Sequence, residues 1–148
     1  MVQKEKIYFA HPVNVFWKYN PKLKAKILEK IKKQFPAVEI IDPDKQEHQD
    51  GYEKYKELYG NGMKYYSEVV LPQCTGCIFL AFRDRMIGKG VFTEVNYFFE
   101  KSLCVWEINP SSFEITEVEQ DESYYQRCLN VSETRKRIRD SEGDSRPY

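Results

Sequence analysis

Residues 88–100 read GKGVFTEVNYFFE, a stretch in which one carboxylate, Glu94, stands in a mostly apolar run behind the turn Gly88-Lys89-Gly90. A glycine-rich turn allows close backbone approach and opens a helix, whose free amides favour a bound anion or an ionised carboxylate. Because Glu94 falls near the first turn of that helix, we expect the helix dipole to keep its pKa low. An ionised carboxylate of this kind suits a nucleophile, although a plain strand-to-helix turn and a solvated glutamate fit the same pattern.

Three more polar side chains follow apolar runs that read as strands. They are His11 after residues 6–10, Asp42 after residues 38–41, and Asp84 after residues 77–82. In a parallel sheet the ligand site lies beyond the carboxyl ends of the strands, so these residues and Glu94 are candidates for one site. A strand-terminal aspartate is also common as a turn or helix cap.

The elements that must position these side chains are strands and helices in alternation. Apolar runs predict strands at residues 6–10, 38–41, 77–82 and 103–108, and helical spacing predicts helices at residues 21–35, 63–73 and 91–101. Pro72 must lie near the end of the second helix or kink it. Continuously apolar strands alternating with helices predict an α/β three-layer sandwich with a parallel sheet of about five strands, flavodoxin-like in outline.

Residues 45–63 interrupt this alternation with a polar, tyrosine-rich segment that has no clear core face. We interpret this segment as a flexible insertion or lid. The tyrosines in and after it either stack on a nucleobase or cover the core from a surface helix, and they are Tyr52, Tyr55, Tyr59, Tyr65 and Tyr66.

The end of the chain is less regular. Residues 113–118 alternate like an edge strand, and residues 124–131 fit either a strand or a helix. Ser132 is a good N-cap for a final helix with the basic cluster Arg135, Lys136, Arg137 and Arg139, which either holds a phosphate, reaches a partner subunit or is solvated. We expect one domain over residues 1–140 and a frayed tail over residues 141–148.

The composition indicates a globular chain without a strong attraction for polyanions. Of its 148 residues 41% are hydrophobic, which suffices for one packed core. Lys plus Arg and Asp plus Glu both number 23, so net charge provides no attraction toward nucleic acid polymers or anionic membranes. No apolar run approaches the roughly 20 residues of a membrane span, and the start is too polar for a signal peptide, so we expect a cytoplasmic protein.

The four cysteines do not form a convincing metal pattern. Cys74 and Cys77 have the CxxC spacing, but a structural zinc needs a second ligand pair, and Cys104 and Cys128 lie 24 residues apart. We therefore expect three or four buried, reduced thiols and no metal, with a redox or metal role as the alternative.

Three segments within residues 6–108 carry a family resemblance, in this order: KIYFAHP, SEVVLPQCTGCIFLAFRD and GKGVFTEVNYFFEKSLCVWEI. Together they resemble the nucleoside 2-deoxyribosyltransferase family and its nucleotide N-glycosidase relatives. That family has an IYLAGP-like first strand, an acidic residue on a helix before an apolar strand, and a segment of the form D-x-G-T-x-x-E-x-G-x-A-x-x-x-G-K-P-V. The resemblance implies a homodimer or larger homo-oligomer.

The resemblance places the family's catalytic glutamate on Glu94, which would attack the anomeric carbon of the sugar and displace the base. Glu68 falls where the family has an acidic helix residue facing the site, and it would bind a sugar hydroxyl or manage the proton of the departing base. Tyr8 matches the tyrosine of the first strand and would steer the nucleophile, unless it is a plain core tyrosine. Asp84 would hydrogen-bond the base or orient Glu94.

The chain also departs from the family pattern. His11 stands where the family has glycine or another small residue, and its imidazole would contact a phosphate, act as an acid, or block the family's substrate. Residues 95–96 and 103–105 replace small, glycine-containing segments, so substrate identity does not carry over. Asp42 and the turn at residues 88–90 complete the expected substrate-binding set.

These residues predict cleavage or exchange of the N-glycosidic bond of a (deoxy)nucleoside or nucleotide, through a glycosyl-enzyme on Glu94. No cofactor is expected, since a carboxylate and a developing oxocarbenium ion are complementary in charge. Two alternatives remain open: a non-catalytic nucleotide-binding or sensing module, and a glutamate-dependent NAD glycohydrolase.

Overall fold

The computed structural model of the protein describes residues 5–12, 21–82 and 84–140, with backbone alone at residues 138–140. The predicted tail and the side chain of Arg139 lie outside this description. The strands are β1 (Lys6–Ala10), β2 (Glu39–Ile41), β3 (Gly76–Phe79), β4 (Cys104–Ile108) and β5 (Ile115–Glu117). The helices are α2 (Pro21–Gln34), α3 (Gln46–Tyr59), α4 (Met63–Tyr65), α5 (Lys89–Glu100), α6 (Glu122–Gln126) and α7 (Val131–Asp140). A π-helical stretch (Tyr66–Val70) and a 3₁₀ turn (Leu71–Gln73) continue α4 without a break, so Pro72 ends this helix as predicted.

The five strands form one sheet in the order β2-β1-β3-β4-β5, with β5 antiparallel to β4 and the other neighbours parallel. This order is the flavodoxin-like one, and it confirms the predicted fold class. The order reverses between β1 and β3, where the crevice beyond the strand ends receives ligands in such sheets. The carboxyl ends of these two strands are therefore the place to look for a site.

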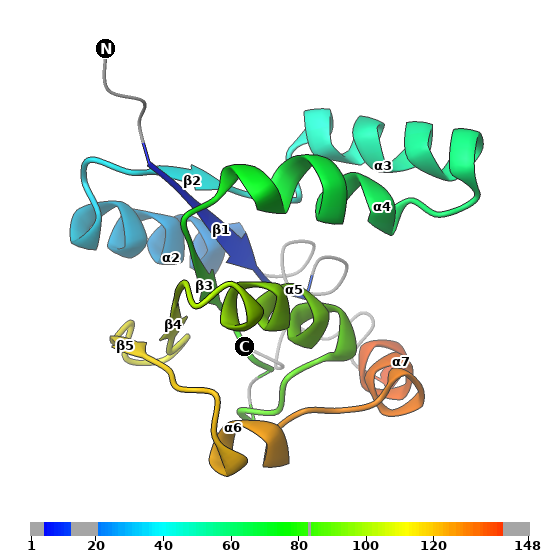
Figure 1. The fold of residues 1–148 in the computed structure, drawn as a ribbon. Coiled ribbons are helices and arrows are strands. Elements are labelled where there is room, and N and C mark those ends of the chain that lie inside the picture. Colours follow the sequence, from blue (N-terminus) through cyan, green and yellow to red (C-terminus); the bar gives the residue numbers. More distant parts are fainter. Residues whose placement is uncertain (1–4, 13–20, 83, 141–148) are drawn as a thin grey trace.

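Alternation along the strands divides the core into two layers on opposite faces of the sheet (Figure 1). Ile7 and Phe9 of β1 pack toward α2, which buries Ile27 and Ile31 against them. Tyr8 and Ala10 point to the other face, which α5 and the helix after α4 cover. The period of two along β1 thus directs Tyr8 toward α5.

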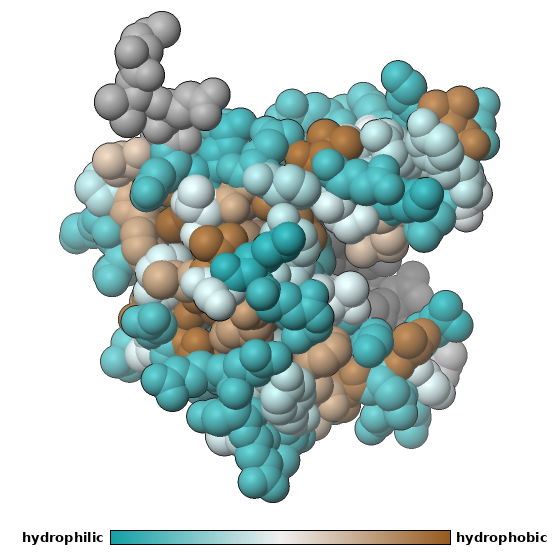
Figure 2. Space-filling view, in the orientation of Figure 1, coloured by the Kyte–Doolittle hydropathy of each residue, from teal (hydrophilic) through white to brown (hydrophobic). Residues whose placement is uncertain are grey.

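The helices α3 and α4 form a hairpin that projects from the edge of the sheet (Figure 1). The prediction of a flexible insertion at residues 45–63 is wrong, because α3 is a regular helix of 14 residues. The lack of a core face was read correctly, since α3 has no buried residue. Figure 2 shows apolar surface at the free end of the hairpin, where Leu58 and Tyr59 are 60% and 59% exposed.

Tyrosine rings lying on glycines hold the hairpin together. A Cβ atom added to Gly51 of α3 would lie 2.3 Å from Cζ of Tyr65, and one added to Gly62 would lie 2.5 Å from Cε2 of Tyr52. Nδ1 of His48 and the hydroxyl of Tyr65 share a hydrogen bond of 2.9 Å that fixes this ring. These contacts give α3 the partners that its composition alone did not reveal.

We predict that Gly51→Ala destabilises the protein, although alanine is about 1 kcal/mol better than glycine within a helix. The added methyl group must displace the Tyr65 ring and its bond to His48, and such overpacking costs about 1–3 kcal/mol. Gly90→Ala is the matched control, because nothing lies within 4 Å of the added Cβ there. Urea unfolding should show a lower free energy of unfolding for Gly51→Ala and no loss for Gly90→Ala. An equal gain in the free energy of unfolding for both variants would contradict the contact between Gly51 and Tyr65.

The C-terminal segment packs beside α5 and closes the loop that precedes it. α7 begins at Val131, two residues earlier than predicted, and its cap is Asn130 rather than Ser132. The side chain of Asn130 accepts a hydrogen bond of 2.8 Å from the amide of Glu133, and Oε1 of Glu133 accepts one of 3.1 Å from the amide of Asn130. This reciprocal capping box satisfies two amides, whereas Ser132 lies within the helix.

A buried ion pair fastens the β3–α5 loop to this C-terminal segment. Glu107 of β4 is 3% exposed and accepts from both Nη atoms of Arg127, at 3.0 and 2.5 Å. Nη2 of Arg85, in the β3–α5 loop, donates to the same carboxylate at 3.0 Å. Nε of Arg127 donates to the carbonyl of Arg85 at 2.8 Å, so the two segments meet at one carboxylate.

The four cysteines are free thiols, but fewer are buried than the sequence suggested. Cys74 and Cys77 are buried, Cys128 is partly exposed and Cys104 is exposed. Cys104 starts the edge-proximal strand β4, where its side chain meets solvent. Among the described helices, none combines the length and apolar character that a bilayer crossing requires.

Candidate active site

A cavity of about 390 Å³ opens beside the carboxyl ends of β1 and β3. Its lining includes Tyr8, His11, Pro43, Tyr66, Gly90 and Glu94. Figure 2 shows the surface indented between the α3–α4 hairpin and α7, the two elements that contribute to opposite walls. The volume lies within the range of small-molecule sites, about 300–1,000 Å³.

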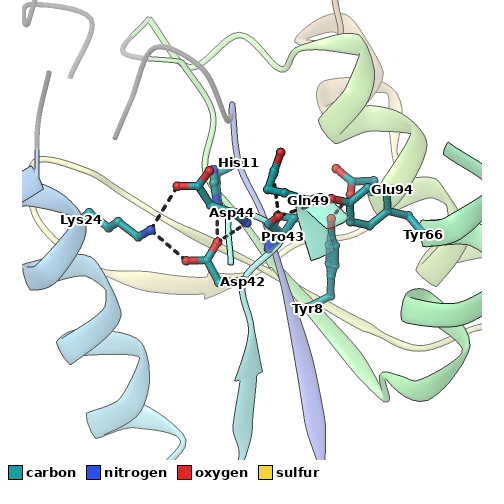
Figure 3. Close-up of polar contacts among 9 residues, drawn as sticks. All are labelled: Tyr8, His11, Lys24, Asp42, Pro43, Asp44, Gln49, Tyr66 and Glu94. Atoms are coloured by element: carbon teal, nitrogen blue, oxygen red, sulfur yellow. Dashed lines mark hydrogen bonds and ion pairs between the residues drawn. The ribbon is translucent and has the colours of Figure 1, made fainter. Parts of the chain in front are cut away.

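Glu94 reaches this cavity because it shares the buried face of α5 with Val91, Val95 and Phe98. Their spacing of three and four residues is that of one helix face, and this face packs on the sheet. The hydroxyl of Tyr8 donates a hydrogen bond to Oε2 of Glu94, across 86 residues of sequence (Figure 3). The predicted pairing of nucleophile and first-strand tyrosine is therefore present as a contact.

Burial decides the charge state of this pair. Desolvation raises the pKa of Glu94 from 4.5 to about 8, and the hydrogen bond from Tyr8 lowers it only in part. Burial and then the nearby Glu94 raise the pKa of Tyr8 well above its ordinary value, so the phenol keeps its proton and remains a donor.

The expectation of a low pKa for Glu94 is wrong. Glu94 is the sixth residue of α5, which begins at Lys89, so it lies in the second turn. The dipole effect falls off within the first turn, whereas removal of water acts on the carboxylate directly. A buried glutamate with one hydrogen bond therefore holds its proton at neutral pH.

On the other side of the cavity, His11 and Asp42 form a buried pair (Figure 3). Nε2 of His11 lies 3.0 Å from Oδ1 of Asp42, which also accepts from the amide of Asp44 at 2.9 Å. Nζ of Lys24 lies 3.1 Å from Oδ2 of Asp42. Burial alone would raise the pKa of Asp42, but His11, the Asp44 amide and Lys24 outweigh burial and hold it well below its usual range. Asp42 thus holds His11 rather than lining the cavity itself.

Aromatic rings form the wall above the pair of Tyr8 and Glu94. Tyr66 lies at the start of the π-helical stretch, and its hydroxyl donates to the carbonyl of Pro43 at 3.3 Å. Its ring lies 6.3 Å from that of Tyr52, and both residues line the cavity, as does Phe82 after β3. Tyr52 and Tyr66 are thus positioned for the stacking role that the sequence suggested, whereas Tyr55, Tyr59 and Tyr65 pack within the hairpin.

The turn at residues 88–90 contributes backbone rather than charge. Gly88 and Gly90 line the cavity, and a Cβ at Gly88 would lie 3.2 Å from the Thr134 methyl group. The amide of Lys89 donates to the hydroxyl of Thr134 at 2.9 Å. Nζ of Lys89 lies 4.7 Å from the ring centre of Phe92, so the predicted binding role of the Lys89 side chain is not supported.

Two predicted catalytic partners lie outside the cavity. Glu68 is exposed and pairs with Lys64 at 3.9 Å, whereas Tyr66 of the same helical stretch is buried and takes the inward position. Asp84 is exposed as well, caps its own turn through the amide of Met86 at 3.2 Å, and pairs with Arg137. Asp84 is therefore a turn cap, which was the alternative to a catalytic role, and its pair with Arg137 anchors α7.

Several lining residues were missed by sequence reasoning. Pro43 and Phe82 lie two and three residues beyond the ends of β2 and β3, so the rule that selected Asp42 and Asp84 could have found them. Thr134 comes from α7, and no local pattern connects it to the Gly88 turn. Its place depends on how the end of the chain folds back.

Within the described part of the chain, no three His, Cys, Asp or Glu side chains come together as metal ligands would. Searches against protein-family models, curated proteins and solved structures find no match to this chain. A functional hypothesis therefore depends on the geometry of the cavity and on the resemblance of three sequence motifs to the nucleoside 2-deoxyribosyltransferase family.

Proposed function

We propose that the protein cleaves or exchanges the N-glycosidic bond of a nucleoside or nucleotide, with Glu94 as the nucleophile. The observation that carries this proposal is a buried carboxylate at the wall of a 390 Å³ cavity, hydrogen-bonded by a tyrosine from the neighbouring strand. An aromatic wall of Tyr52, Tyr66 and Phe82 supplies faces on which a planar base can stack. The order of the three resembling motifs supports the same reaction.

The chemistry follows from the two states of Glu94. In its ionised form the carboxylate attacks the anomeric carbon as the bond to the base breaks, and a glycosyl-enzyme results. Tyr8 donates to one oxygen and leaves the other for the sugar. Water resolves the intermediate to the free sugar, whereas a second base resolves it to an exchanged nucleoside.

The raised pKa of Glu94 also favours a second candidate, a nucleotide-binding module without turnover. A carboxyl group that is protonated at neutral pH can donate a hydrogen bond to a ligand but cannot attack carbon. The two candidates differ in their response to pH. An enzyme gains activity as pH rises through about 8, while a binding module releases no base at any pH.

A panel of nucleosides, nucleotides and NAD tests the proposal. The protein is incubated with each compound at about pH 9, where Glu94 is ionised, and free base is measured by chromatography. Release of a nucleobase supports the proposal, and release of nicotinamide supports an NAD glycohydrolase. Tight binding without release favours the binding module and contradicts the proposal. An added acceptor base separates exchange from hydrolysis.

We predict that Tyr8→Phe shifts the acidic limb of the pH–rate profile to higher pH. The lost hydrogen bond lowers the pKa of Glu94 in the wild type, so its removal leaves the carboxyl harder to ionise. A charge-assisted hydrogen bond contributes about 1.5–3 kcal/mol, which corresponds to a rate at least roughly sevenfold lower near pH 8. Tyr66→Phe is the control, because its hydroxyl bonds a carbonyl, and an equal shift there would argue against the assignment.

A further inference from the structure

The outer edge of β5 has no neighbouring strand among the described residues (Figure 1). In an antiparallel pair, residues that bond the neighbouring strand alternate with residues whose amides and carbonyls face away from it. The amide of Val118 and the carbonyl of Glu114 each make a hydrogen bond of 2.9 Å on the β4 side. Ile115 and Glu117 have the opposite parity, so their amides and carbonyls point outward, where a further strand can pair with them.

A groove of about 390 Å³ lies beside this edge, on the face of the sheet that α2 covers. Phe35 directly follows α2 and packs on Trp106 of β4 with 5.0 Å between ring centres, so the end of α2 lies over β4. The groove is therefore the recess between α2 and the outermost strand. Its lining comes from α2 on one side and from residues at and before the start of β5 on the other: Lys30, Lys33 and Gln34, and Phe113, Glu114 and Ile115.

The two elements beside this groove carry opposite charges. The helix α2 contains six lysines and one glutamate, whereas residues 114–122 contain five acidic residues and no basic one. Within the part of the chain that the structure describes, no ion pair engages Lys30, Lys33 or Glu117. The net charge of the whole chain is zero, so two copies do not repel each other overall. A surface with both signs of charge side by side is complementary to a second copy of itself.

Antiparallel pairing of β5 with β5 of a second copy would bring these charges together. The outward groups fit the register that places Ile115 opposite Glu117 of the second copy, and a twofold axis through Thr116 repeats the pair. The side chains of Ile115 and Glu117 both lie on the α2 face, as do those of their β4 partners. Since directly opposite side chains have Cβ atoms about 4.5–5.5 Å apart, Glu117 of the second copy would lie beside Ile115, at the groove that Lys30 and Lys33 line.

We propose that the outer edge of β5 is the contact of a homodimer, in which the two sheets join into one and Glu117 of each copy meets Lys30 and Lys33 of the other. The inference is independent of the proposed glycosidic reaction, because Tyr8 and Glu94 lie on the other face of the sheet. The contact joins two strands of three residues each, so we expect a weak dimer that forms well above the concentrations of unfolding experiments.

Two charge reversals and their mixture test the contact. Glu117→Lys places only cations at each groove, and the double variant Lys30→Glu/Lys33→Glu places only carboxylates there. Each variant alone should therefore raise the Kd of dimerisation by at least roughly tenfold. An equimolar mixture of the two should form a heterodimer with a Kd near that of the wild type, because both halves of the contact then join opposite charges. Analytical ultracentrifugation measures each Kd, and Glu53→Lys, at an exposed position of α3, is the matched control.

An engineered disulfide tests the register. Thr116 would face Thr116 of the second copy with Cα atoms about 4.5 Å apart, so Thr116→Cys should form an intermolecular disulfide under mild oxidation. Glu114→Cys is the control, because its two copies would lie four residues apart along the paired strands, about 13 Å, which is too far for a disulfide. The exposed Cys104 is present in both variants, so any cross-link through it would appear equally in both.

Three results would overturn the proposal. The first is a chain that stays monomeric up to about 1 mM, which would make β5 an edge that its charges protect from pairing. The second is a dimer that neither reversal weakens, which would place the interface elsewhere. The third is a mixture that does not recover the wild-type Kd. Recovery cannot come from two misfolded variants, so it separates a lost contact from a lost fold.

Discussion

Glu94→Gln is expected to abolish base release while making the protein more stable at alkaline pH. Removal of the proposed nucleophile should lower kcat by at least roughly 10³-fold. Stability should move the other way, because burial raises the pKa of this carboxyl from 4.5 to about 8. The folded state then binds a proton that the unfolded state releases, so wild-type stability falls as pH rises from 4.5 to 8.

The size of this effect makes the test sharp. At 1.36 kcal/mol for each pH unit between the two values, ionising the buried carboxyl costs on the order of 5 kcal/mol above pH 8. Urea unfolding at about pH 6 and pH 9 measures the free energy of unfolding of both proteins. The difference in favour of Glu94→Gln should be larger at pH 9 than at pH 6. Glu100→Gln, an exposed position of the same helix, should show neither effect. A variant that loses activity and stability together would point to a structural glutamate.

Glu107→Gln is expected to destabilise the fold by about 3 kcal/mol, although it changes no volume. The carboxylate is 3% exposed and receives two nitrogens of Arg127 and one of Arg85. Loss of its charge leaves the guanidinium of Arg127, itself only 21% exposed, without a counter-charge in a poorly hydrated place. Chemical denaturation of the two proteins at pH 7 measures the difference.

A double-mutant cycle distinguishes an ion pair from a general packing defect. Arg127→Gln combined with Glu107→Gln should cost clearly less than the sum of the two single changes. Glu117→Gln, on the exposed face of β5, should change stability by less than about 0.5 kcal/mol. Additive losses would mean that the two charges do not depend on each other.

The fold was predictable because apolar runs and helical spacing are local sequence patterns, and they alternate along the chain. The run KIYFA, with every residue apolar after Lys6, reads as a strand buried on both faces, and β1 lies inside the sheet. The α3 helix was missed because its tyrosines pack on glycines of the same hairpin, which hydrophobic periodicity does not register. Ser132 was preferred as a cap because serine is a good capping residue, while the box formed by Asn130 and Glu133 satisfies two amides instead of one.

The candidate site was predictable only in part, for physical reasons. Glu94 and Tyr8 could be paired because strand and helix periodicities direct both to one layer. The pKa of Glu94 could not, since desolvation depends on everything packed around the carboxyl. Glu68 was misplaced because a sequence offset of two from Tyr66 does not reveal which residue of a helix faces inward.

The hydrogen bond between the amide of Lys89 and the hydroxyl of Thr134 has a consequence for synthesis of the chain. A ribosome delivers Tyr8 and Glu94 before it delivers α7, so a nascent chain holds both side chains of the candidate site while the first amide of α5 lacks its acceptor. The pocket wall that Thr134 supplies is also missing at that stage. Chains terminated early, before residue 130, would thus carry an intact Glu94 in an unfinished pocket, and the pocket would be complete only once α7 has been made.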